Sequence, residues 1–170
     1  MKKNIILFLI FLILPNFSLA CDKEDFLKFV SAGKKKCIAL QTIGKIERNK
    51  KNLIIFLHGD LSSGAKPPGK KGYWKLGNEL LSDNVNFFFL ARPGYTLDSG
   101  RKSYGSYKET RKAKTNYKWE KLELVAKAAQ NLKEHYNANN LIMIGHSGGA
   151  LTSATINSRV PKLIDKSILI

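Results

Sequence analysis

The sequence is poor in cysteine and histidine, and each shortage limits what the chain can be. Two cysteines, Cys21 and Cys37, allow at most one disulfide within the chain. Three histidines, His58, His135 and His146, leave few candidates for a general base. No spacing of metal-ligating residues indicates a metal site, and no motif indicates a cofactor, so we expect neither.

Acidic residues are also scarce. The chain has 13 Asp and Glu against 29 Lys and Arg, which gives a formal net charge of +16. Such a charge suits nucleic acid, an anionic membrane surface or acidic substrates. The lysines are spread along the chain, however, and they form no nucleic-acid-binding motif. We therefore expect a solvated basic surface and no nucleic-acid partner.

The N-terminus has the pattern of an export signal. Lys2 and Lys3 precede an unbroken apolar run over residues 5–14, and residues 18–20 (SLA) place small side chains where a signal peptidase reads them. The apolar run is too short for a comfortable membrane span. We interpret residues 1–20 as a signal peptide, which predicts a periplasmic or secreted protein.

Two processing routes stay open at Cys21, the residue after the predicted cleavage site. Simple cleavage leaves a soluble chain of 150 residues, long enough for one domain with a real core. In this route Cys21 and Cys37 can form a disulfide that contributes about 3 kcal/mol, or remain two thiols. Alternatively, Ala20-Cys21 fits the end of a bacterial lipobox, so that Cys21 is lipidated and anchors the protein; Ser18 departs from the usual leucine.

Hydrophobic periodicity gives the order of elements. A run without alternation, typical of a parallel strand buried on both faces, covers residues 53–57, and we expect further strands over residues 85–91, 141–144 and 166–170. Helical spacing marks residues 73–81, 119–136 and 149–159. Residues 37–47 indicate a strand or hairpin, and residues 22–30 a short helix or packed arm.

This order predicts an α/β fold: a three-layer, open and mostly parallel sheet flanked by helices. Ligand sites in such sheets lie at the carboxyl ends of the strands. His58-Gly59, the segment 92–95 and Ser147 each follow a predicted strand, so we expect these three loops to meet at one edge of the sheet.

The most specific motif is Gly145-His146-Ser147-Gly148-Gly149, a Gly-x-Ser-x-Gly pattern between a predicted strand and a predicted helix. That context is typical of a nucleophile elbow, a sharp turn that exposes a serine hydroxyl. Small flanking residues allow the strand and the helix to approach closely, and the first N–H groups of the helix face any oxyanion that forms. Ser147 is the candidate nucleophile.

The sequence resembles the α/β-hydrolase superfamily in three pieces, LIIFLHGD (53–60), FFFLARPGY (87–95) and LIMIGHSGG (141–149), in that superfamily's order and spacing. It looks most like exported bacterial members near the prolyl-oligopeptidase and dienelactone-hydrolase branches. The resemblance implies a serine hydrolase that cleaves small-molecule esters or peptides through a covalent acyl-enzyme on Ser147.

The resemblance also implies an oxyanion hole formed by two backbone N–H groups, those of Gly148 and Asp60. His58 and Gly59 precede Asp60 in the same loop, and Arg92 and Tyr95 follow the next strand; these four residues are weaker candidates for lining the site. For Arg92 and Tyr95 a packed turn at the end of a strand is the stronger interpretation.

The sequence departs from the superfamily in one respect. There the acid and the histidine of the triad follow the serine on later strands, whereas this sequence has no histidine after Ser147. His58 is expected to order its loop, His135 to lie at the opposite edge of the sheet, and His146 to point away from the serine. We interpret residues 21–170 as a hydrolase domain whose C-terminal part is missing. We expect the hydrolase activity of the 170-residue chain to be weak or absent. The alternative is a non-catalytic exported binding protein on the same scaffold.

Overall fold

The computed structural model describes residues 25–60, 71–106 and 117–170, and the predicted signal peptide lies outside them. The strands are β1 (Phe29–Ser31), β2 (Cys37–Ile43), β3 (Asn52–Leu57), β4 (Val85–Leu90), β5 (Asn140–Gly145) and β6 (Lys166–Leu169). The helices are α1 (Lys71–Glu79), α4 (Trp119–His135) and α5 (Gly148–Arg159). In this part of the chain no helix has the length and apolar character needed to cross a membrane.

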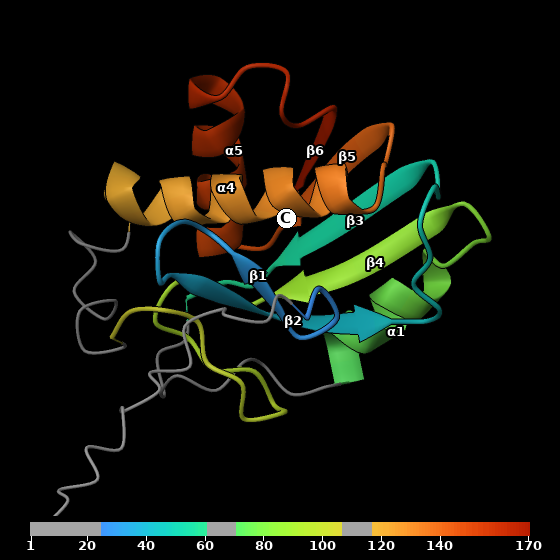
Figure 1. The fold of residues 1–170 in the computed structure, drawn as a ribbon, viewed down its shortest axis with the longest axis horizontal. Coiled ribbons are helices and arrows are strands. Elements are labelled where there is room, and N and C mark those ends of the chain that lie inside the picture. The colour runs from blue at the N-terminus through green and yellow to red at the C-terminus, as the bar shows by residue number, and fades with distance from the viewer. Residues whose placement is uncertain (1–24, 61–70, 107–116) are drawn as a thin grey trace, which may run out of the picture.

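The strands form one sheet in the order β1-β2-β4-β3-β5-β6 (Figure 1). β4, β3, β5 and β6 run parallel, whereas β1 and β2 extend the sheet in an antiparallel manner from β4. The register aligns the carboxyl ends of the central strands, because Leu57 of β3 pairs with both Leu90 of β4 and Gly145 of β5. The loops that follow these three strands therefore start side by side.

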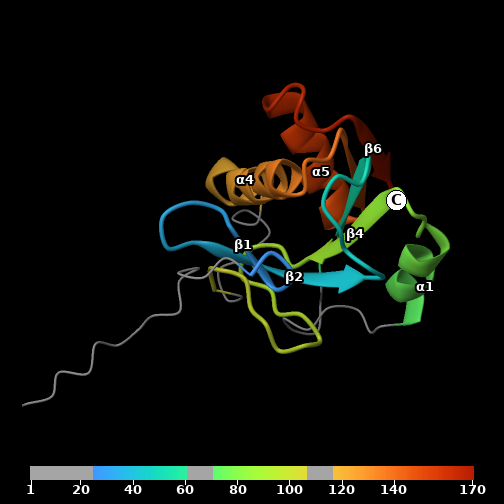
Figure 2. The same ribbon diagram turned by 45° about the vertical axis from the view of Figure 1, so that its right-hand side comes forward.

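Helices cover both faces of the sheet: α4 and α5 lie on one side and α1 on the other (Figure 2). The central strand β3 serves both layers. Leu53, Ile55 and Leu57 pack in the cluster that includes α4 and α5, whereas Ile54 and Phe56 face the cluster against which α1 packs. Every second residue of β3 points to the same face, so an unbroken apolar run fills two cores at once.

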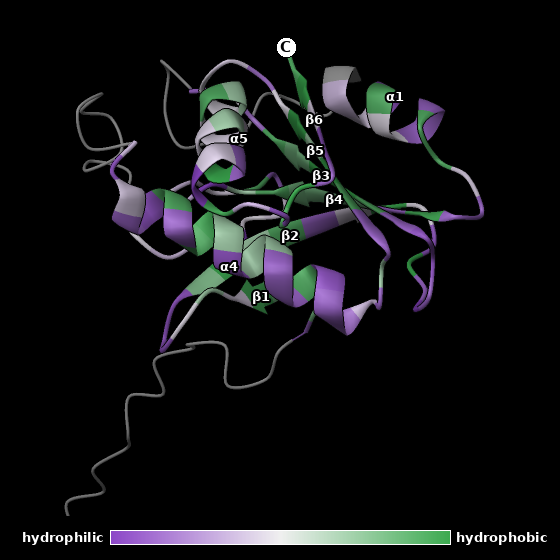
Figure 3. Ribbon diagram, turned by 90° about the horizontal axis from the view of Figure 1, so that it is seen from above, coloured by the Kyte–Doolittle hydropathy of each residue, from purple (hydrophilic) through white to green (hydrophobic). Residues whose placement is uncertain are grey.

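Helix α4 shows why its sequence forms an amphipathic helix. Its buried residues recur at helical spacing and are Leu122, Leu124, Val125, Ala126, Ala128, Ala129 and Leu132. Figure 3 shows hydrophobic (green) and hydrophilic (purple) residues alternating along α4, as expected for a helix with one apolar face. This face explains why α4 packs on β1, β2 and β5 and forms a large part of the core.

The predicted fold class is confirmed: the sheet is open and mostly parallel, and helices flank both faces. The predicted strands and helices recur within a few residues of their expected bounds. Of the two alternatives expected for residues 22–30, a short helix or a packed arm, the helix is absent from the described part. Residues 26–28 form a turn and Phe29–Ser31 is strand β1, because pairing with β2 satisfies the backbone groups that a helix would use.

Strand β6 lies at the edge of the sheet and presents apolar side chains to solvent. Ile168, Leu169 and Ile170 are 39%, 54% and 61% exposed, respectively. Such an edge, with unpaired backbone groups and apolar side chains, favours association with another strand.

Candidate active site

Ser147 sits in a strained turn between β5 and α5. Its φ is 51° and its ψ is −117°, a region that residues with a Cβ rarely adopt. Such a conformation costs roughly 1–3 kcal/mol and persists only where the surroundings enforce it. The residue is exposed to solvent and precedes the first residue of α5. This is the geometry that the Gly-x-Ser-x-Gly pattern predicts for a nucleophile elbow.

The flanking glycines allow three segments of backbone to meet behind Ser147. A Cβ on Gly145 would collide with the backbone of Gly149, and a Cβ on Gly149 would collide with the carbonyl group of Leu57. Strand β5, helix α5 and the end of β3 are therefore in direct backbone contact. The His146 N–H donates to the Leu57 carbonyl over 3.0 Å and ties the elbow to β3.

The N–H of Gly148 is positioned to stabilise an anion. The Ser147 N–H is already bound to the Ile170 carbonyl at 2.8 Å, and the Gly149 N–H to the His146 carbonyl at 2.8 Å. The Gly148 N–H has no backbone acceptor among the described residues, and it lies at the positive end of the 12-residue helix α5. The assignment of Gly148 and Asp60 as the oxyanion pair stays a prediction.

The loop after β3 reaches the serine. A Cβ on Gly59 would lie 3.0 Å from Ser147 Cβ and 2.9 Å from His146 Nδ1, so only glycine allows this approach without displacing those side chains. The predicted meeting of the 58–60 loop with the elbow is therefore present. Arg92, which follows β4, joins them through its N–H, which donates to His58 Nε2 over 3.2 Å.

His58 holds this loop and is buried completely. Its Nδ1–H donates to the Gly59 carbonyl over 2.7 Å, and its Nε2 accepts the Arg92 N–H, so both ring nitrogens are used and the tautomer is assigned from these bonds. Burial, together with the nearby Arg92 charge, lowers the pKa of His58 from 6.5 to about 3. The ring is therefore neutral at physiological pH and orders the loop.

Asp60 has a side-chain role that the sequence did not predict. Its carboxylate accepts hydrogen bonds from Arg92, from the Tyr95 hydroxyl at 3.1 Å and from the Tyr117 hydroxyl. Partial burial opposes ionisation, but the bonds from Tyr117, Arg92 and Tyr95 outweigh it and lower the pKa of Asp60 below its ordinary value. Burial raises the pKa of Tyr95 to about 12, so this hydroxyl remains a donor.

The other two histidines have partners of their own. His146 Nδ1 lies 3.1 Å from the Tyr73 hydroxyl, at hydrogen-bond distance. The His135 ring stacks on Phe26 with ring centroids 3.6 Å apart, at the end of α4 that precedes β5 and hence at the opposite edge of the sheet from Ser147. Asp165 also lies at that opposite edge, where it accepts the N–H of the first buried residue of β5.

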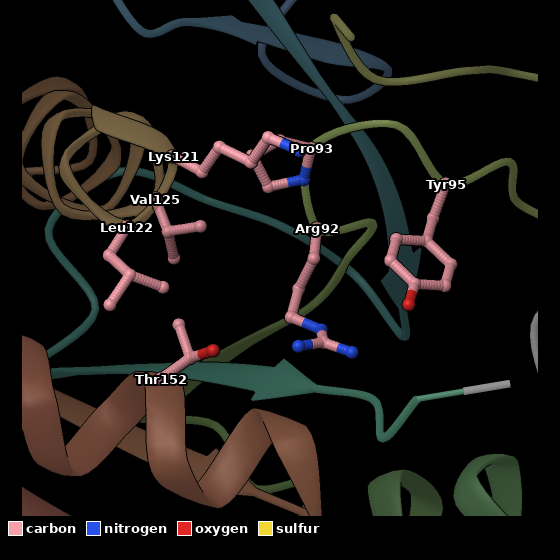
Figure 4. A pocket seen from close by; sticks show the side chains of 7 residues that line it. All are labelled: Arg92, Pro93, Tyr95, Lys121, Leu122, Val125 and Thr152. Carbon is pink, nitrogen blue, oxygen red and sulfur yellow. The ribbon is translucent and has the colours of Figure 1, made fainter. Parts of the chain in front are cut away.

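A small cavity of about 10 Å³ lies beside Arg92, between α4 and α5, and has room for about one water molecule. Figure 4 shows the residues that line it, which are Arg92, Pro93, Tyr95, Lys121, Leu122, Val125 and Thr152. Arg92 Nε is buried and has no hydrogen-bond partner among the described residues. Across residues 25–60, 71–106 and 117–170, no cluster of His, Cys, Asp or Glu could hold a metal ion.

Sequence reasoning named Arg92 and Tyr95 as weak lining residues with a packed turn as the stronger interpretation, and both side chains are buried. It missed Tyr117, which follows a long polar stretch without periodicity and gives no local signal of its place at Asp60. Cys37 is disulfide-bonded, and Cys21, its predicted partner, lies outside the described residues.

Comparison with solved structures decides the fold. A predicted CIB-like hydrolase from Thermoplasma acidophilum matches 84% of this chain with a TM-score of 0.55 and 15% identity. Epoxide hydrolase A from Mycobacterium thermoresistibile matches 84% of this chain with a TM-score of 0.57 and 15% identity. An esterase from Exiguobacterium antarcticum matches 84% of this chain with a TM-score of 0.54 and 18% identity. The chain has the α/β-hydrolase fold. No protein-family model and no curated protein sequence matches it.

The matched structures are longer than this chain. It spans 60% of the Thermoplasma hydrolase, 37% of the epoxide hydrolase and 44% of the esterase. Identities of 15–18% establish the fold, and the chemistry must be argued from the residues of this chain.

Proposed function

We propose that this protein is a hydrolase that uses Ser147 as a nucleophile to cleave esters or peptides through a covalent acyl-enzyme. The observation that carries the proposal is the backbone of Ser147, strained at φ 51° and exposed at the start of α5. Strain at a functional turn is maintained when it serves the site, and here the strained residue directly precedes Gly148 at the start of α5.

In the proposed reaction Ser147 Oγ attacks the carbonyl carbon of the substrate, and the carbonyl oxygen gains negative charge. The Gly148 N–H and the Asp60 N–H donate to that oxygen. The leaving group then departs with the proton that the Ser147 hydroxyl loses. Water next attacks the acyl-enzyme, which releases the acid and returns a proton to Ser147 Oγ. Each oxyanion donor is worth about 2.7–4 kcal/mol in reactions of this kind.

The hydrogen bonds and positions of the histidines limit the rate at which Ser147 can react. His58 is neutral and bound on both ring nitrogens, and His135 lies at the far edge of the sheet. A serine without a paired base keeps only the residual catalysis of the oxyanion hole and binding, roughly 10³–10⁴ over water. We therefore propose that Ser147 reacts slowly in this chain.

A fluorophosphonate probe tests the nucleophile. Ser147 Oγ would form a bond to phosphorus and fluoride would leave, while the hydroxyl proton passes to solvent. We expect slow labelling that peptide mass spectrometry assigns to Ser147 and that Ser147→Ala abolishes. Ser158, an exposed serine on the same helix α5, supplies a matched control, because Ser158→Ala should leave the labelling unchanged. Equal labelling of the wild type and Ser147→Ala would overturn the proposal and leave a non-catalytic binding protein as the alternative.

We also propose that the protein is exported, with residues 1–20 as its signal peptide. A disulfide-bonded Cys37 supports this, because structural disulfides persist in oxidising compartments. Intact-mass measurement of the protein from a bacterial host tests the proposal. A chain beginning at unmodified Cys21 is expected, a diacylglyceryl mass on Cys21 would indicate the lipoprotein route, and a chain beginning at Met1 would contradict export.

A further inference from the structure

The carboxylate of Asp60 lies beside the proposed oxyanion donor. A Cβ on Gly148 would be 2.8 Å from Asp60 Oδ2 and 2.9 Å from its Cγ, so the carboxylate rests against the backbone of Gly148. The Asp60 side chain is 42% exposed and faces the start of helix α5. A fixed negative charge therefore stands next to the place where the substrate oxygen would become negative.

Such a neighbour would hinder the reaction if it were uncompensated. Two like charges about 6 Å apart, at an effective dielectric constant of about 20, repel strongly enough to slow a reaction on the order of 100-fold. The Asp60 carboxylate would also interact with the positive end of the α5 dipole at Gly148, and this would weaken the interaction of that dipole with the substrate oxygen.

The guanidinium group of Arg92 supplies the compensating positive charge, and its burial and its ion pair fix its position. Its Nη2 forms an ion pair with Asp60 Oδ1, and its side chain is only 4% exposed. Its backbone N–H donates to His58 Nε2, which fixes the same loop from the other side. Tyr117 donates to the second carboxylate oxygen and also lies against Gly148. Arg92 thus binds the 58–60 loop through both its backbone N–H and its guanidinium group.

We propose that Arg92 is a positioning residue that neutralises Asp60 beside the oxyanion site, so that the charge of Arg92 matters to acylation only because Asp60 is there. This inference rests on the proposed function of Ser147. It makes a specific prediction about coupling: loss of Arg92 alone leaves an uncompensated carboxylate against Gly148, whereas loss of both charges removes the problem.

The test is a double-mutant cycle on the labelling rate of Ser147 by a fluorophosphonate, with Arg92→Met, Asp60→Asn and the double variant. Arg92→Met is expected to slow labelling roughly 100-fold, and the double variant to return within about tenfold of the wild type. Asp60→Asn keeps the backbone N–H of residue 60 and the Arg92 cation but removes the negative charge beside Gly148, so it is expected to label faster than the wild type. Arg92→Lys should retain most of the rate, because it keeps the charge.

A merely structural role for Arg92 gives the opposite pattern, since a second substitution in a damaged loop would leave the double variant as slow as Arg92→Met or slower. That result would overturn the inference. If Arg92→Met fails to fold by circular dichroism, Asp60→Asn decides, and labelling more than about tenfold slower than wild type would refute it. Lys133→Met removes a Lys–Asp pair at the far edge of the sheet and should leave the rate unchanged.

The two proposals fail in distinguishable ways. A wild-type chain that is not labelled at Ser147 removes the proposed function. A wild-type chain that is labelled, with additive effects of Arg92→Met and Asp60→Asn, removes only the inference about charge compensation.

Discussion

The buried ring of His58 predicts that the stability of this protein depends on pH between about 6.5 and 3. Burial lowers the pKa of His58 from 6.5 to about 3, so below pH 6.5 the unfolded chain binds a proton that the folded chain rejects. Folding stability is therefore unaffected by this group above pH 6.5 and falls as the pH decreases toward 3. Each pH unit inside that window costs about 1.36 kcal/mol.

Between pH 7.5 and pH 5 the loss from His58 amounts to about 2 kcal/mol, a range in which ordinary carboxylates contribute little. His58→Gln keeps an amide near the ring nitrogens and cannot be protonated. It destabilises the protein at pH 7.5, but its disadvantage relative to the wild type should shrink by about 2 kcal/mol at pH 5. Urea unfolding at both pH values and constant ionic strength measures this difference.

Phe56→Leu supplies the control, because it removes packing from the same strand without a titratable group and should destabilise the protein equally at both pH values. If the gap between wild type and His58→Gln is the same at pH 7.5 and pH 5, the His58 ring is not held neutral and the argument for its role as a fixed loop support fails.

Two further substitutions test the packing around the site and the far edge of the sheet. Gly149→Ala places a Cβ against the Leu57 carbonyl and should destabilise the protein by about 1–3 kcal/mol in urea unfolding, whereas the exposed control Leu151→Ala on the same helix should change stability by less than about 1 kcal/mol. Asp165→Ala leaves the buried N–H of Leu141 without its 2.7 Å acceptor and should cost about 1–3 kcal/mol, but Asp165→Asn keeps an acceptor and should cost less; equal losses would contradict this role.

Much of the fold was predictable from the sequence, because the central strands are apolar on both faces and must be buried on both. An apolar run such as residues 53–57 has no polar face, so it must be buried on both sides, and only a sheet between helices provides that. The N-terminal arm was harder to predict. Strand β1 has three residues, and its pairing with β2 is a tertiary contact that local sequence does not encode.

The candidate site was predictable where backbone geometry dictates residue type. Gly145, Ser147 and Gly149 stand in a pattern that close backbone approach requires, and the structure gives a physical reason for each glycine. The contact between Tyr117 and the Asp60 carboxylate was not predictable, because the two residues are 57 positions apart in the sequence and form no local pattern. Their assembly depends on where the loops after the strands run.

The arrangement of the site follows from the register of three parallel strands. Leu57, Leu90 and Gly145 pair at the carboxyl ends of β3, β4 and β5, so the loops that follow start within one sheet edge. The β3 loop brings the anionic Asp60, the β4 loop brings the buried cation Arg92, and the β5 loop brings the serine. An antiparallel strand among these three would send one loop to the other edge, and the charge beside the serine would then lose its partner. The parallel order of the sheet is thus what allows a carboxylate to lie next to the proposed oxyanion site.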